Sequence, residues 1–348
     1  MNIIDLTLTP VLKELFNRNE ESIVLDEELD ELIASPEPLS SLFISHDGNM
    51  EEALEAAGFD SFFIAPSKID ESMLGESPCY KAYMGLEDFH AGSISFSKRD
   101  YLPGQIFVSG DKIERKGDML DYTPNGYFSK RIPYPELSKG GIPWMSIIPH
   151  EINTMKHAIE QSHGKVLTYG CGLGYFAFMA SLKDDVESVS IVEKDKTLLG
   201  LFEKHFLPLF PHKEKIVLVN QDAFEFASNP KNKGYDVLFA DLWHNADDGL
   251  ELYCKLLSLE GNAKENLYWI EEGILTYLRR YLLTALYEDA LMQQGEKIVY
   301  DAKSKEDAIL LKLRATFSKP VATKQELMEI IKLGSIKKRI LDNHLLID

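Results

Sequence analysis

Three carboxylates and a glycine-rich loop stand where predicted strands end. The loop at residues 169–174 (YGCGLG) joins a strand at residues 165–169 to a helix. Glu193 closes the next strand about twenty residues further on, where a carboxylate can accept both hydroxyl groups of a ribose. Asp222 and Asp241 follow the third and fourth strands, and a carboxylate at position 222 can accept a hydrogen bond from an adenine amino group. Because open α/β sheets bind ligands at the carboxyl ends of their strands, these positions predict a nucleoside site.

Four motifs in this region resemble the class I S-adenosylmethionine-dependent methyltransferases in order and spacing. They are residues 166–174 (VLTYGCGLG), 190–195 (SIVEKD), 220–226 (NQDAFEF) and 235–243 (YDVLFADLW). The resemblance covers roughly residues 145–315. It implies an α/β fold with a Rossmann-like sheet of seven mostly parallel strands and helices on both faces. It also implies S-adenosylmethionine as the cofactor.

The resemblance assigns individual residues to that cofactor. Glu193 matches the ribose-binding acid and Asp222 the adenine-binding acid of the family. The G-x-G-x-G spacing favours this family over the dinucleotide-dependent oxidoreductases. The full set of expected cofactor-binding residues is Tyr169, Gly170, Gly172, Gly174, Glu193, Lys194, Asp222, Ala223 and Asp241.

One position departs from the family pattern. Thr168 stands two residues before Gly170, where the family usually has an acid that helps to hold the amino end of the methionine moiety. Glu151, just upstream on a predicted helix, could take over that role. Cofactor binding that is unchanged in Glu151→Ala would contradict this hypothesis.

Methyl transfer from a sulfonium is a direct displacement and needs few chemical groups. The enzyme supplies alignment and excludes water, and it supplies a base only where the nucleophile must lose a proton. Asp241 is the candidate for orienting the substrate or the sulfonium, and a helix cap is the plainer alternative. His244 is the candidate base, with an exposed loop histidine as the alternative.

Several further side chains are expected around the acceptor, with ordinary packing as their alternative role. These pocket candidates are Trp144, His150, Glu151, Tyr175 and Trp243. A magnesium site made by Asp241, Asp247 and Asp248 is disfavoured, because acids so close in one loop rarely complete an octahedron. We therefore expect no metal.

The composition limits the partners and the compartment. The chain has 348 residues, with 37 Lys and Arg against 56 Asp and Glu, and a formal net charge of −19. A chain this acidic is disfavoured for binding nucleic acid or anionic lipid. Three widely spaced cysteines fit a reducing cytoplasm, and no apolar run approaches the roughly 20 residues that span a bilayer.

We expect a smaller α+β N-terminal domain at residues 1–146, the cofactor domain at 147–315 and a helical tail at 316–348. The N-terminal domain is predicted to be helical to residue 90, with one buried strand at 61–65. A small antiparallel β unit is predicted at 91–135, with turns at 109–111 and 124–126, then a Pro- and Gly-rich linker or covering loop at 132–149. The remaining expectations are closing strands at 297–300 and 308–313, and a tail helix that starts with the capping box Thr323-x-x-Glu326.

Three functions agree with these features. The first is methyl transfer to a small-molecule or protein acceptor. The second is aminopropyl transfer of the polyamine-synthase kind, since an acidic protein suits a cationic amine and a small β unit precedes the sheet. The third is nucleoside binding without catalysis, which Thr168 suggests. The N-terminal domain is expected to shape the acceptor pocket or an oligomer contact, for instance in a homodimer.

Overall fold

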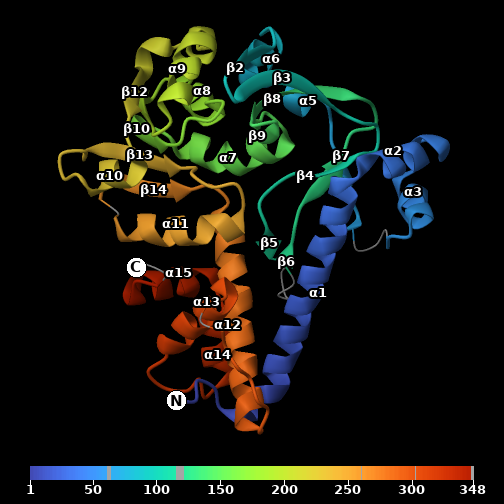
Figure 1. Ribbon diagram of the computed structural model, residues 1–348, viewed down its shortest axis with the longest axis vertical. Helices are drawn as coiled ribbons and strands as arrows, with labels where there is room; N and C mark the ends of the chain where they lie inside the picture. The colour runs from blue at the N-terminus through green and yellow to red at the C-terminus, as the bar shows by residue number, and fades with distance from the viewer. Residues whose placement is uncertain (61–63, 115–120, 260, 302, 346–348) are drawn as a thin grey trace.

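The computed structural model describes residues 1–60, 64–114, 121–259, 261–301 and 303–345. It contains a parallel sheet in the order β12-β11-β10-β13-β14, which lies at the upper left of Figure 1. The strands are β10 (Gly164–Tyr169), β11 (Val186–Glu193), β12 (Ile216–Asn220), β13 (Tyr235–Ala240) and β14 (Ala263–Tyr268). Every neighbouring pair is parallel. The continuous apolar runs of the inner strands are buried, as a sheet covered on both faces requires.

Helices alternate with these strands, as the pattern predicts. They are α7 (Pro149–Gln161), α8 (Tyr175–Ser181), α9 (Lys196–Leu201), α10 (Ala223–Ser228) and α11 (Ala246–Ser258). A π-helical turn at Phe202–Phe206 and 3-10 turns at Leu207–Leu209 and Lys213–Lys215 lie between α9 and β12. The α/β class of this region is therefore confirmed.

The expected seven-stranded sheet has five strands within the described residues. Residues 297–300 form no strand, and residues 308–313 lie in helix α13 (Lys305–Ala315). Ser304 caps that helix by accepting a hydrogen bond from Asp307 N, and Ile309, Leu310 and Leu313 face the core. The apolar run at 308–313 therefore follows the period of a helix.

The C-terminal helices form a separate layer below the sheet in Figure 1. They are α12 (Glu271–Gln293), α13, α14 (Lys324–Ile330) and α15 (Leu333–Asn343). The capping box predicted at Thr323 and Glu326 starts α14. The long N-terminal helix α1 (Thr9–Ala34) packs against α12, with Phe16 stacked on Tyr287 at 4.4 Å between ring centres.

The remaining elements lie between α1 and β10. The helices are α2 (Pro36–Ser45), α3 (Met50–Ala57), α5 (Ser72–Gly75) and α6 (Pro78–Met84), and a 3-10 turn at Leu6–Leu8 precedes α1. The strands are β1 (Ser67–Lys68), β2 (Phe89–Ala91), β3 (Ile94–Tyr101), β4 (Ile106–Val108), β5 (Ile113–Glu114), β6 (Asp121–Tyr122), β7 (Asn125–Tyr127), β8 (Ile132–Lys139) and β9 (Ile142–Ser146). They form sheets β2-β3-β8-β9, β1-β7-β4 and β5-β6.

Residues 132–149 form neither a linker nor an irregular covering loop, the two structures that their prolines and glycines suggest, because β8 and β9 occupy most of this stretch. Gly140 and Gly141 have φ of 63° and 80°, which is the conformation of a two-residue hairpin turn. Pro133 and Pro135 are two residues apart, so their missing N–H groups face the same edge of β8. The residues that indicate this hairpin in the sequence are Gly140 and Gly141.

Neither predicted turn of the β unit closes a hairpin between the strands on either side of it. β4 pairs with β7 rather than with the strand that follows it, and Asn125 and Gly126 lie inside β7. The chain does bend at Gly110 and Asp111, but β5 beyond this bend pairs with β6, and the Asp111 carboxylate bonds to the start of α12. The strand predicted at 61–65 falls mostly on residues 61–63, outside the described residues, and Ile64 and Ala65 are in no strand.

None of the described helices is long and apolar enough to cross a lipid bilayer.

Candidate functional site

A cavity of about 420 Å³ opens at the carboxyl ends of β10, β11 and β13. Its floor is the loop after β10, and the hairpin strand β9 covers it with Pro143, Trp144 and Met145. The other lining residues are Glu151, Gly170, Cys171, Gly172, Val192, Glu193, Lys194, Asp222, Ala223, Phe224, Asp241, Leu242, Trp243, His244, Leu252 and Trp269. Most of the residues predicted for the cofactor and the acceptor therefore meet in one place.

The three glycines of the loop have a packing explanation within the chain. Gly170, Gly172 and Gly174 have φ of 93°, 47° and 71°, a region that favours glycine. A Cβ atom would collide with the Asp241 carbonyl at position 170, with the Met145 side chain at 172 and with the Phe202 ring at 174. The glycines alone are therefore no argument for a ligand.

Two of the carboxylates are fixed by backbone N–H groups. Glu193 accepts hydrogen bonds from Cys171 N at 3.1 Å and Asp195 N at 2.7 Å. Asp222 is the N-cap of α10, and its Oδ1 accepts hydrogen bonds from Phe224 N at 2.8 Å and Glu225 N at 3.2 Å. Both side chains are held rigidly at the cavity wall, and each carboxylate keeps acceptor sites that these bonds do not use.

Glu151 and Asp241 form a different kind of pair. Burial raises the pKa of Asp241 to about 7. Burial and the nearby negative charge of Asp241 raise the pKa of Glu151 well above its usual range. Within the described residues, neither side chain has a hydrogen-bond donor or a cation as partner. Both also line a smaller adjoining hollow of about 20 Å³, together with the buried Thr168.

The candidate base lies at the exposed rim of the cavity. His244 has 61% of its side chain exposed, and its Nδ1 lies 3.0 Å from Asp248 Oδ2. Asp248 also completes a capping box with Asn245 at the start of α11. Asp247 accepts a hydrogen bond from Tyr277 and pairs with Lys305. In the described ranges, no group of three His, Cys, Asp or Glu side chains could hold a metal ion.

Four predicted residues lie outside the main cavity or behind its wall. Tyr169 is fully buried, and its hydroxyl donates to Asn262 Oδ1 at 3.4 Å. Gly174 and Tyr175 line only the smaller hollow. His150 lies behind Trp269, with its ring edge-on at 5.7 Å, and burial lowers its pKa to about 4.

Sequence reasoning did not name two residues of the wall. Trp269 follows β14, a strand whose polar sequence (AKENLY) gave no apolar pattern. Met145 covers the glycine loop from β9, which was expected to be irregular. With these two residues placed, all three tryptophans of the chain line the same cavity.

Solved structures with similar folds include a spermidine synthase from Thermotoga maritima, with 15% identity, a TM-score of 0.30 and coverage of 49% of this chain and 68% of that one. The CcbJ methyltransferase from Streptomyces caelestis has 22% identity and a TM-score of 0.21, over 36% of this chain and 43% of its own. MNMC2 from Aquifex aeolicus has 16% identity and a TM-score of 0.29, over 62% and 82%. No family model and no curated protein matches the sequence. The chain is thus distantly similar in structure to methyltransferases and a spermidine synthase.

Proposed function

We propose that this protein is an S-adenosylmethionine-dependent methyltransferase that acts on a small-molecule or protein acceptor. The observation that carries the proposal is the pair Glu151 and Asp241, two half-buried carboxylates that line the cavity and have no cation as partner within the described residues. Buried carboxylates are costly unless they are paired. A ligand that carries both an ammonium and a sulfonium would supply the missing positive charge.

The other lining residues fit the same ligand. Glu193 retains acceptor sites for a pair of ribose hydroxyls, and Oδ2 of Asp222 remains for an exocyclic amino group. The volume of about 420 Å³ lies within the range of small-molecule sites. Glu151 would hold the ammonium, in place of the acid that Thr168 replaces.

When bound, S-adenosylmethionine supplies a methyl carbon that a nucleophile can attack directly. The chain's own part is alignment and exclusion of water. Three tryptophans line the site and would shield the bound cofactor from solvent: Trp144, Trp243 and Trp269. His244 at the rim, with its Nδ1 held by Asp248, would take a proton from an acceptor that must lose one.

A second candidate is aminopropyl transfer to an amine. Four carboxylates line the cavity, whereas its basic lining residues are the exposed Lys194 and His244. That excess of acid suits a cationic acceptor. The two reactions leave different products, because methyl transfer yields S-adenosylhomocysteine and aminopropyl transfer yields methylthioadenosine.

The proposal is tested by measuring cofactor affinity in two variants of the same helix. Glu151→Gln should weaken S-adenosylmethionine binding at least tenfold, because it removes the proposed partner of the ammonium. Glu160→Gln, on the exposed side of α7, is the matched control and should bind as the wild type does. Equal affinities of both variants for S-adenosylmethionine would show that Glu151 does not bind the ammonium group.

A further inference from the structure

The wall of the cavity turns a strained corner where β14 leads into α12. Ile270, the residue before α12, has φ of 45° and ψ of 40°, a left-handed conformation that β-branched residues rarely adopt. Its side chain offers no cap for the first N–H groups of the helix. Such a residue persists only where its surroundings hold it in place.

The missing cap comes from a distant part of the sequence. Asp111 Oδ2 accepts a hydrogen bond from Glu272 N at 3.1 Å, and Asp111 Oδ1 accepts one from Gly273 N at 3.0 Å. The approach is close enough that a Cβ at position 273 would lie 2.6 Å from Asp111 Oδ1. A carboxylate also suits the positive end of the helix dipole.

Two tryptophans of the cavity are linked to the turn at Ile270 that Asp111 stabilises, Trp269 as its neighbour in the chain and Trp243 through a hydrogen bond. Trp269 immediately precedes Ile270, its N–H donates to Ala240 O at 2.9 Å, and its indole donates to Thr154 Oγ1 at 2.8 Å. Its carbonyl accepts the indole N–H of Trp243 at 3.1 Å. A shift of the corner would therefore move both Trp269 and Trp243.

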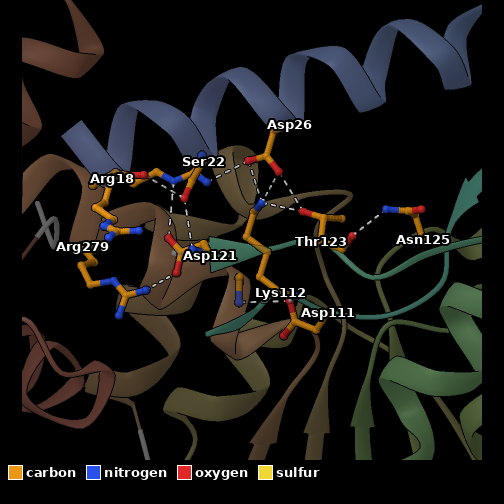
Figure 2. A network of polar contacts seen from close by, with 11 residues as sticks. Arg18, Ser22, Asp26, Asp111, Lys112, Asp121, Thr123, Asn125 and Arg279 are labelled. Atoms are coloured by element: carbon orange, nitrogen blue, oxygen red, sulfur yellow. Dashed lines mark hydrogen bonds and ion pairs between the residues drawn. The ribbon is translucent and has the colours of Figure 1, made fainter. Parts of the chain in front are cut away.

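The loop that carries Asp111 is held in place by the contacts of the next residue, Lys112, which Figure 2 shows. Lys112 Nζ lies 2.6 Å from Asp26 Oδ1 on α1 and 2.7 Å from Thr123 Oγ1. Asp26 in turn accepts from Arg280 of α12 at 2.8 Å. The ionic network fixes the loop that carries Asp111 between α1 and α12.

We infer that Asp111 is a positioning residue of the cavity. By capping α12 and holding the Ile270 corner, it sets the place of Trp269 in the cavity wall. The N-terminal region thereby helps to shape a cavity whose floor belongs to the parallel sheet, although Asp111 itself does not line that cavity. This inference holds for any ligand of the site.

The test uses tryptophan fluorescence without any ligand, so that it does not depend on the proposed cofactor. In a Trp144→Phe/Trp243→Phe background, Trp269 is the one remaining tryptophan of the chain. Asp111→Ala should shift its emission to the red and raise acrylamide quenching at least twofold. Asp111→Asn keeps one acceptor oxygen for the helix and should restore most of the original signal.

Two further variants separate positioning from general stability. Thr323→Ala removes the corresponding cap from α14, outside the cavity, and should lower the melting temperature without changing the emission. Gly273→Ala pushes the Asp111 carboxylate aside without removing it and should reproduce the red shift. If Asp111→Ala and Gly273→Ala leave emission and quenching as in the parent, Asp111 does not position Trp269 and the inference fails.

Discussion

Glu151 and Asp241 are the two carboxylates of the cavity that accept no hydrogen bond and pair with no cation among the described residues. Both are half-buried, and burial raises the pKa of each. Burial favours the protonated form, so the pair holds protons that exposed carboxylates would have lost. A cation placed between them reverses that balance and favours the ionised form.

Binding of S-adenosylmethionine is therefore expected to release protons near neutral pH. The bound cation lowers the pKa of Asp241 from about 7, so affinity should rise from about pH 6 to about pH 8. Calorimetric titration in buffers of different ionisation enthalpy measures the protons released. Asp241→Asn should remove most of the effect, and binding with the same heat in every buffer would contradict it.

A second prediction concerns the glycines of the loop after β10 and the free energy of unfolding. Gly170→Ala places a Cβ against the Asp241 carbonyl, which is backbone and cannot swing away, whereas Gly172→Ala meets the flexible side chain of Met145. Both also have positive φ. We expect losses of about 3 kcal/mol for Gly170→Ala and about 1 kcal/mol for Gly172→Ala. Urea unfolding of the two variants measures both, and the reverse order would contradict the packing described here.

At the scale of elements, the hairpin of β8 and β9 covers the cavity. Lys139 Nζ pairs with Asp195 Oδ2 at 2.9 Å and lies 4.6 Å from the centre of the Trp144 ring. Lys139→Ala should weaken cofactor affinity several-fold while changing the free energy of unfolding by less than about 1 kcal/mol. Lys130→Ala, which breaks the pair with Glu71 away from the cavity, is the control. Equal affinities in both variants would show that the hairpin does not hold the ligand.

Some of the helices and strands could be predicted from the sequence, and others could not. Strands β10, β11 and β13 and helix α12 were predictable because their apolar patterns decide their structure locally. Strand β14 was not, since its polar sequence forms a strand only beside β13. Residues 308–313 carry apolar side chains that suit either structure, and burial against α12 decides for the helix.

The candidate site was predictable in part for the same reason. Glu193, Asp222 and Asp241 follow strands, so their meeting at one sheet edge could be inferred from the sequence alone. The contribution of Asp111 could not, because it lies 161 residues before its partner Glu272 and in a predicted turn. Contacts of that range depend on the tertiary fold.

In the whole molecule, the N-terminal residues lie beside the layer of C-terminal helices (Figure 1). Asp289 of α12 is buried and accepts hydrogen bonds from Ile3 N at 2.8 Å and Ile4 N at 3.3 Å. It also pairs with Arg314 of α13 at 2.6 Å. The hydrophobic cluster around α12 includes residues from Ile3 to Leu345, and two smaller clusters lie in the N-terminal region.

Asp289→Ala is therefore expected to destabilise the entire chain. The change removes the carboxylate partner of Arg314, which still donates to the Ala285 carbonyl, and the acceptor of two backbone N–H groups, at a cost of about 3 to 5 kcal/mol. Unfolding followed by far-UV circular dichroism and by tryptophan fluorescence should shift together to lower denaturant. If only one of the two signals shifted to lower denaturant, the layer of C-terminal helices would unfold separately from the parallel sheet.

The most direct test of the proposed cofactor is a calorimetric titration of the full chain with S-adenosylmethionine. The cavity described here predicts saturable binding of one molecule per chain, and binding at least tenfold weaker in Glu193→Gln. No heat and no shift in melting temperature at millimolar cofactor would contradict both transferase proposals.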